Sequence, residues 1–260
     1  MGSMKEAQAH ESSARYLANE SILISNDNQK VLFDPFFHKD FGIYQLVPAN
    51  TLANVFAGKA PFDNITAIVV SHAHADHFAA DDMLRYLIKY PHTKFVAPQQ
   101  AVDELLALPN ANKVKPQLRP INLAYNDPAK QIEVDGLIFE GVRIPHAGWP
   151  SRANIENIVF RVTLKDSENR LLTVMHMGDA DADDNHYLPY KLHWQSRESD
   201  VAFPPYWFFY SMEGNYILDD LINAKQHVGV HVPVVVPKEL KKTGKDYFSK
   251  PSEQRHINKH

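Results

Sequence analysis

The chain of 260 residues contains no cysteine, which excludes disulfide bonds, a thiol nucleophile and thiolate metal ligands. It also lacks any apolar stretch close to the roughly 20 residues that a membrane-spanning helix needs, so we expect no span. Basic residues are not in excess, because 27 Lys and Arg stand against 31 Asp and Glu. Proteins that bind long nucleic acids neutralise many phosphates with basic side chains, so nucleic acid is not an expected partner.

The N-terminal residues carry signs of processing. Met1–Ser3 ahead of Met4 is typical of residues left by cloning. Ala7-Gln8-Ala9 has the small-x-small form of a signal-peptidase site, although no apolar segment precedes it. This tripeptide favours a periplasmic or exported protein that begins at His10, with a cytoplasmic one as the alternative. We set residues 1–9 aside and expect one domain over residues 10–260, with a polar, Lys-rich surface tail from about Pro237.

The spacing of apolar residues predicts strands and helices in alternation. Apolar runs predict strands over 21–25, 30–34, 65–70, 93–97, 158–164, 171–175 and 228–236, and a hairpin over 131–144. Helical spacing predicts helices over 81–90, 98–109 and 216–225. The first helix should bury Ile88, and strand 158–164 alternates as a half-buried strand does. Residues 36–62 should form a long, irregular, aromatic-rich loop. This order favours a mixed α/β fold of two sheets covered by helices.

The most informative stretch is residues 71–78, which read Ser-His-Ala-His-Ala-Asp-His-Phe directly after the apolar run 65–70. Three imidazoles and one carboxylate fall within six positions, and these ligands suit Zn, Fe(II) and Mn(II). A short loop that leaves a strand can direct alternate side chains towards two ions about 3.5–4 Å apart. His72 and His74 would face one ion, and Asp76 and His77 the other. A surface loop that is merely His-rich is the alternative.

Three later motifs could complete such a site: Ile144-Pro145-His146-Ala147-Gly148, Met177-Gly178-Asp179 and Gly229-Val230-His231-Val232. Each follows or ends an apolar run, and each alone would be weak. Together with the first motif, their order and spacing resemble the metallo-β-lactamase-fold hydrolase superfamily over about residues 16–235. The resemblance implies a four-layer αββα sandwich with the metals at one edge of the sheets.

The resemblance also implies two divalent metal ions, zinc on isolation, with manganese or iron as alternatives. Seven side chains would bind them: His72, His74 and His146 the first, Asp76, His77 and His231 the second, and Asp179 both. A hydroxide between the ions would attack the substrate, and Asp76 would accept its proton. Asp34 ends an early strand and matches an early Asp of the family, so it is the candidate to hydrogen-bond a ligand histidine. A simple Asp-Pro turn is the alternative reading of Asp34.

The substrate is less well defined by the sequence. Trp149 follows the third motif, and Tyr206 and Trp207 lie in the aromatic run 203–210, so these three are the candidate substrate contacts. Core packing is the alternative for them. The segments 19–24, 32–35 and 178–181 resemble the branch that contains L-ascorbate-6-phosphate lactonase and phosphodiester-cleaving lipases. A small-molecule ester, lactone, amide or phosphodiester is therefore the expected substrate.

Other functions on this fold remain open. One group of true β-lactamases has Cys where this chain has Asp179, so that activity is disfavoured. The diiron oxygen reductases replace a His of the first motif by Glu, whereas this chain has His74. An iron-dependent dioxygenase is the alternative enzyme, and a non-catalytic metal-binding scaffold is the alternative outside catalysis. Scaffold relatives tend to lose ligands, and here every ligand position is filled.

Overall fold

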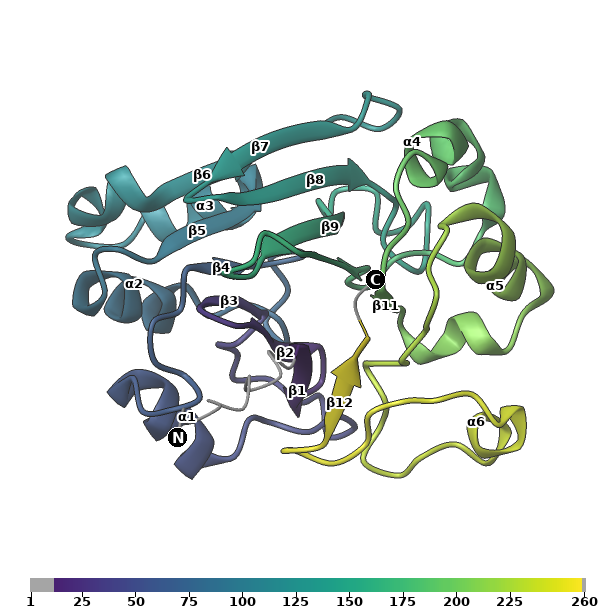
Figure 1. Cartoon of the computed structure of the whole chain (residues 1–260), viewed down its shortest axis with the longest axis horizontal. Coiled ribbons are helices and arrows are strands. Elements are labelled where there is room, and N and C mark those ends of the chain that lie inside the picture. The colour runs from purple at the N-terminus through teal and green to yellow at the C-terminus, as the bar shows by residue number, and fades with distance from the viewer. Residues whose placement is uncertain (1–11, 259–260) are drawn as a thin grey trace, which may run out of the picture.

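The computed structural model describes residues 12–258, in which two β-sheets pack face to face (Figure 1). The first sheet has the strand order β12-β1-β2-β3-β4-β5-β6, and the second has the order β11-β10-β9-β8-β7. One hydrophobic core lies between the sheets, and a further core lies between each sheet and its own helices. The predicted αββα sandwich is confirmed. The cloning remnant and the signal-like tripeptide of residues 1–9 lie outside the described residues.

The first sheet is mixed. Its strands are β1 (Ser12–Ala18), β2 (Ser21–Asn26), β3 (Gln29–Phe33), β4 (Ala67–Val69), β5 (Lys94–Pro98), β6 (Leu118–Ile121) and β12 (Gln254–Ile257). The strands from β12 to β3 pair antiparallel, and those from β3 to β6 pair parallel. The carboxyl ends of β3 and β4 therefore lie at the same edge.

The second sheet is antiparallel except at one side. Its strands are β7 (Lys130–Val134), β8 (Leu137–Arg143), β9 (Ile158–Lys165), β10 (Leu171–His176) and β11 (Val201–Phe203). β8 and β10 both pair antiparallel with β9, so they run in the same direction, and β11 pairs parallel with β10. The predicted half-buried alternation in β9 is wrong, because residues 158–164 are all buried. Helices cover the face of this sheet that points away from the first sheet, so both faces of β9 are buried, and Arg161 and Thr163 on the helix-covered face have hydrogen-bond partners.

Three helices pack on the first sheet: α1 (Ala49–Ala57), α2 (Ala80–Lys89) and α3 (Gln99–Leu106). α2 buries Met83, Leu84 and Leu87 on one face, whereas Ile88 is 48% exposed, contrary to the prediction. Shorter helices accompany the second sheet: α4 (Lys191–Gln195), α5 (Met212–Tyr216), α6 (Lys238–Thr243) and a π-helical turn over Ile217–Leu221. Further 3₁₀ turns span Ala111–Gln117, Asp184–His186, Leu188–Tyr190 and Tyr206–Phe209. Among the described residues, none of the helices has the length and apolar character to cross a membrane.

Four predicted segments need correction. The loop 36–62 contains α1, and the helix predicted over 216–225 starts earlier and ends at Leu221. The segment 228–236 is not a strand, because it forms only isolated bridges such as Pro205 to Val230 and Gly229 to Tyr247. The tail from Pro237 contributes α6 and β12 and buries Leu240, Phe248 and Ile257. It is therefore part of the fold and not a polar surface extension.

Candidate metal centre

The loops that carry the predicted ligands meet at one edge of the sandwich. His72, His74, Asp76 and His77 follow β4, which runs parallel to β3. His146 follows β8 and Asp179 follows β10, two strands with the same direction. A backbone bridge pairs His146 with Ala180, and the Ala147 amide donates to the carbonyl of Asp179 over 2.7 Å. Strand direction thus brings residues that are far apart in sequence to a common point.

Gly178 allows the loop after β10 to pack closely against Asn157 and Ser71. Its φ is +56°, in the left-handed region that favours glycine. A Cβ at this position would collide with Oδ1 of Asn157 and with the side chain of Ser71. The residue before Asp179 must therefore be glycine for the two loops to pack at this distance.

One cluster consists of His72, His74, His146 and Asp179, whose ligand atoms all lie within 4.8 Å of one another. His74 Nδ1 lies 3.2 Å from His72 Nε2 and 3.0 Å from His146 Nε2. Asp179 Oδ2 lies 3.3 Å from His146 Nε2 and 3.9 Å from His72 Nε2. Three nitrogens and one oxygen therefore converge on a common centre.

A second cluster consists of Asp76, His77 and His231. The Nε2 atoms of His77 and His231 lie 3.3 Å apart, and Asp76 Oδ2 lies 3.6 Å and 3.5 Å from them. Asp179 Oδ1 lies 3.3 Å from His77 Nε2 and 3.1 Å from His231 Nε2. Asp179 therefore directs one carboxylate oxygen to each cluster. The structure brings together all seven side chains that the sequence singled out.

The donor atoms fit metal ions. In a tetrahedral zinc site with Zn–N bonds of about 2.0–2.1 Å, neighbouring nitrogens lie about 3.3 Å apart. The nitrogen pairs of the two clusters lie 3.0, 3.2 and 3.3 Å apart. Asp179 Oδ1 is buried without a hydrogen-bond partner, although it faces two imidazoles. A cation at each cluster would supply the missing partner of Asp179 and of the convergent lone pairs.

The pKa values of the histidines shift in opposite directions in the two clusters. Burial lowers the pKa of His72 well below its ordinary value and the pKa of His74 to about 4, so both imidazoles are neutral and can donate lone pairs. Burial also acts to lower the pKa of His77, but Asp179, Asp34 and Asp76 outweigh it and raise that pKa. A cation that binds at His77 must therefore displace a proton, which makes its binding dependent on pH.

Asp34 and Ser71 hold two of the imidazoles in place. Asp34 Oδ2 accepts a hydrogen bond from His77 Nδ1 over 2.9 Å and another from Ser71 Oγ over 2.6 Å. Ser71 Oγ in turn lies 3.0 Å from Nδ1 of His72. One buried carboxylate thus orients a histidine of each cluster. Asp34 has a φ of +40° and His231 a φ of +59°, so the fold maintains strained backbone at both positions.

Two more buried side chains, Glu20 and His176, lie close to the clusters, and neither was predicted as a site residue. Glu20 is fully buried, and neither of its carboxylate oxygens has a hydrogen-bond partner. It forms ligand-like groups with His77 and Asp179 and with Asp34 and His176. Burial, followed by the charge of Asp179, raises its pKa well above the ordinary value. Its negative charge is therefore suppressed in the absence of cations.

The predicted aromatic contacts lie at different distances from the clusters. The ring of Trp207 has its centroid 5.4 Å from that of His231, and its Nε1 donates to the carbonyl of Ala180 over 3.1 Å. Tyr206 packs edge-on against Trp207 with ring centroids 5.5 Å apart. Trp149 packs on Tyr125 with ring centroids 4.8 Å apart. None of the three predicted aromatic residues lines the cavity above the clusters.

A cavity of about 360 Å³ opens over the two clusters. It is lined by Phe41, Ile43, Tyr44, His74, Asp76, Arg152, Asp179 and His231. Four of these residues were not predicted as site residues. The aromatic-rich segment 36–62 was a usable signal for Phe41 and Tyr44, whereas no motif marked Ile43 or Arg152. Tyr44 packs edge-on against the His231 ring at 4.1 Å, and burial raises the pKa of Tyr44, so its hydroxyl remains a hydrogen-bond donor.

Comparison with known proteins agrees with this geometry. The family model described as a beta-lactamase superfamily domain matches residues 13–205. No curated protein sequence matches the chain.

Among solved structures, the metallo hydrolase Igni18 from Ignicoccus hospitalis has a TM-score of 0.62 at 16% identity, covering 95% of this chain and 99% of that one. An isothiocyanate hydrolase from Delia radicum gut bacteria has a TM-score of 0.62 at 13% identity, covering 94% and 98%. The diiron β-hydroxylase CmlA from Streptomyces venezuelae has a TM-score of 0.55 at 10% identity, covering 97% of this chain but 55% of that one.

Proposed function

Because the chain belongs to the β-lactamase superfamily and has the metallo-β-lactamase fold, we propose that it is a dinuclear, metal-dependent hydrolase of small molecules. The observation that carries the proposal is Asp179, which directs Oδ2 to His72 and His146 and Oδ1 to His77 and His231. A carboxylate placed between two such clusters suits two adjacent cations. Zinc is the proposed metal, and manganese and iron use similar ligands.

Each residue of the site has a proposed role in metal binding or proton transfer. His72, His74 and His146 would hold one ion, His77, His231 and Asp76 the other, and Asp179 both. Bound there, the two ions would lower the pKa of a coordinated water and polarise the bond to be cleaved. Asp76 lines the cavity, and although its burial acts to raise its pKa, the neighbouring imidazoles of His231 and His77, 3.5 and 3.6 Å away, hold that pKa well below its ordinary value. It therefore stays an ionised base that would accept the proton of the attacking water.

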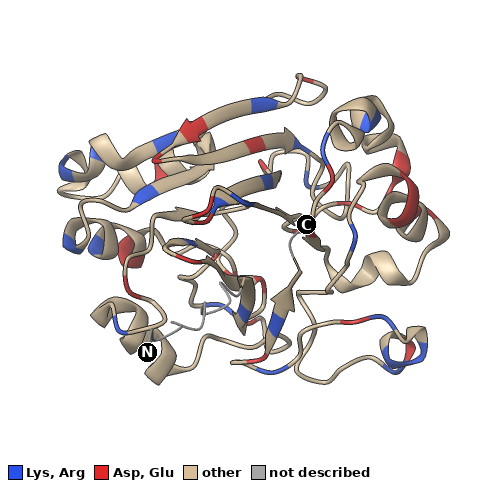
Figure 2. Cartoon of the chain, in the orientation of Figure 1, with Lys and Arg blue, Asp and Glu red and all other residues tan. Residues whose placement is uncertain are grey.

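We propose an ester, lactone, amide or small phosphodiester as the substrate, as in the branch that contains L-ascorbate-6-phosphate lactonase and phosphodiester-cleaving lipases. Lys and Arg are distributed over many elements and interspersed with Asp and Glu (Figure 2). A polymer of phosphates would need several cationic contacts along one surface. The cavity of about 360 Å³ instead suits one small molecule. Trp207 lies beside His231 but lines a different cavity, so the proposed aromatic contacts are Phe41 and Tyr44, which line the cavity over the clusters.

Metal analysis and a hydrolysis panel test this function. Protein purified without chelator should contain two zinc ions per chain, because seven ligand side chains exceed what one tetrahedral zinc can use. It should hydrolyse an aryl ester or an acyl lactone with a higher kcat/KM than a short RNA. The panel also includes bis-(p-nitrophenyl) phosphate, which represents small phosphodiesters. RNA as the best substrate would refute the proposal. Iron with oxygen uptake would favour the dioxygenase, and protein without metal would favour the scaffold.

A further inference from the structure

The cavity over the clusters combines three kinds of surface. Asp76, Asp179 and the histidines form the part that would hold the ions. Phe41 and Ile43 line another part and are 63% and 49% exposed, so they offer apolar surface to a ligand. Arg152 is the only Lys or Arg among the described residues that line the cavity.

Arg152 has no acidic partner among residues 12–258. Several other arginines have acidic partners: Arg85 lies 2.9 Å from Asp82, and Arg161 lies 2.7 Å from Glu140. Nη1 of Arg152 lies 3.5 Å from the Nδ1 nitrogen of His146. That nitrogen lies 2.7 Å from the carbonyl oxygen of Ala147 and donates its proton there when Nε2 faces the cluster. It cannot also accept from Arg152, so the guanidinium remains available to a ligand.

The loop that carries Arg152 is ordered by its own backbone. The amide of Ile155 donates to the carbonyl of Arg152 over 3.0 Å, and the amide of Ala153 donates to that of Pro150 over 3.1 Å. The aliphatic stem of Arg152 runs along Gly148, where an added Cβ would lie 3.5 Å from Cδ. Arg152 is exposed, and this turn together with the contact to Gly148 places its guanidinium beside His146.

From these contacts we propose that Arg152 binds an anionic group of the substrate, a carboxylate or a phosphate, while the bond to be cleaved lies over the histidine clusters. This inference rests on the hydrolase function proposed above and specifies its substrate. A guanidinium binds such a group through two parallel hydrogen bonds. One arginine suits one anionic group on a small molecule, and Phe41 and Ile43 would contact the apolar remainder.

A pair of esters that differ only in charge tests the proposal. We would compare kcat/KM for the 4-nitrophenyl monoester of suberic acid, whose chain is too long for its carboxylate to attack its own ester readily, and for its methyl-capped neutral analogue. The wild-type protein should prefer the charged ester. Arg152→Met should lower the charged-to-neutral ratio by about 10–100-fold, since a hydrogen bond to a charged group contributes about 1.5–3 kcal/mol. Arg152→Lys should keep part of the preference, because it keeps the charge but loses the paired geometry.

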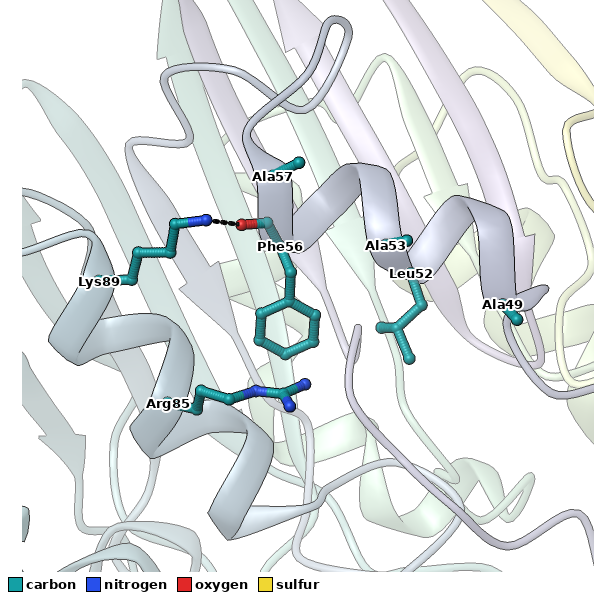
Figure 3. Close-up of a pocket in the computed structure, with 7 residues that line it drawn as sticks. All are labelled: Ala49, Leu52, Ala53, Phe56, Ala57, Arg85 and Lys89. Carbon is teal, nitrogen blue, oxygen red and sulfur yellow. Dashed lines mark hydrogen bonds between the residues drawn. The ribbon is translucent and has the colours of Figure 1, made fainter.

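Arg85→Met is the matched control. Arg85 lies on α2, stacks 3.9 Å above the Phe56 ring and lines a groove formed with α1 (Figure 3). This groove shares no lining residue with the cavity over the clusters. The control variant should retain the wild-type charged-to-neutral ratio.

Two results would overturn the role of Arg152: equal kcat/KM for the two esters in the wild-type protein, or a preference that survives in Arg152→Met. If the zinc-loaded wild-type protein hydrolyses neither ester, the proposed hydrolase function on such esters fails, and binding still tests Arg152. Calorimetric titration of suberate into both zinc-loaded proteins should then give weaker binding for Arg152→Met. Equal affinities would refute the proposal.

Discussion

Two buried clusters of charged residues in this molecule differ in how their polar atoms are satisfied. In the first, on β8 and β9, Arg161 donates from Nε and Nη2 to the two oxygens of Glu140 over 2.9 and 2.7 Å. Arg161 Nη1 donates to the carbonyl oxygens of Trp194 and Arg197 over 3.0 and 2.9 Å. Every charged group of this pair has its partner within the protein.

The histidine and aspartate clusters at the sheet edge show the opposite condition. Asp179 Oδ1, His231 Nδ1 and both oxygens of Glu20 are buried without a hydrogen-bond partner. Buried polar groups without partners cost about 1–3 kcal/mol each, and a charged group costs more. The unpaired groups at the sheet edge would gain partners from a bound ligand, whereas the Arg161–Glu140 pair is already satisfied within the chain. This difference is what we expect between a binding site, formed by the histidine and aspartate clusters, and a structural ion pair, formed by Arg161 and Glu140.

The largest effect should come from Asp179→Ala. The substitution removes the carboxylate between the clusters, so that two adjacent cations would repel each other without compensation. We expect loss of both metals in elemental analysis. Activity should fall by more than the roughly 10–100-fold that is typical of residues which only orient a ligand. Asp181→Ala is the control, because Asp181 is on the same loop but lines a neighbouring cavity. Two retained metals and near-normal turnover in Asp179→Ala would show that Asp179 does not bridge.

Arg161→Met should break the Arg161–Glu140 pair and leave the histidine and aspartate clusters intact. It leaves Glu140 buried without its partner, and breaking such a pair costs about 3–5 kcal/mol. Denaturant unfolding should show this loss, while the metal content of the folded protein should stay unchanged. The double variant Arg161→Met/Glu140→Leu should recover part of the stability, because no charge is then left unpaired. A single variant as stable as the wild type would contradict the structural role of the pair.

Asp34→Asn should weaken metal binding without abolishing it. The amide keeps the shape of the side chain but removes the charged acceptor of His77 Nδ1. Loss of such a partner typically lowers metal affinity about 10–100-fold, which competition with a chromogenic chelator measures. Asp63→Asn is the control, since Asp63 is a surface carboxylate paired with Lys30 over 2.7 Å. Unchanged metal affinity in Asp34→Asn would favour the alternative reading, in which Asp34 only forms the Asp-Pro turn.

The smallest expected effect is a change in the free energy of unfolding at acidic pH. Burial acts to raise the pKa of Glu140, but the hydrogen bonds from Arg161 outweigh it and lower that pKa. Because the pKa is lower in the folded state, the contribution of Glu140 to stability is complete above its unfolded pKa of about 4.3 and is lost as the pH falls through the folded value. The free energy of unfolding of the wild type should therefore approach that of Arg161→Met/Glu140→Leu below about pH 4. A constant difference would argue against the pair.

Local sequence signals predicted the site better than the elements around it. The His-x-His-x-Asp-His run needs only a strand before it, and the order of the later motifs supplied His146, Asp179 and His231. Arg152 was missed because a single arginine in a loop has no pattern, and its availability follows from the absence of a partner in three dimensions. Glu20 was missed for the same reason, since only the packed structure shows that its oxygens lack partners.

The errors in the fold have tertiary causes. The segment 228–236 is apolar enough for a strand, yet it meets its neighbours only at single bridges, is interrupted by Pro233 and is followed by Pro237. α1 was hidden because its Leu52, Val55 and Phe56 share one helical face within only nine residues. β12 was hidden because Gln254-Arg255-His256 is polar, as suits a strand at a sheet edge.

The pairing of β12 with β1 has a consequence for the order of folding. Ser12 pairs with Ile257, so strands from opposite ends of the described chain close the same side of the first sheet. Contacts of such sequence separation form late, because a long loop must be ordered before they contribute. During synthesis, β1 and β2 leave the ribosome long before β12 does, and the outer edge of β1 stays open to other chains in that interval. A truncation at Pro237 would make this vulnerable intermediate permanent, so such a protein should aggregate even with every metal ligand in place.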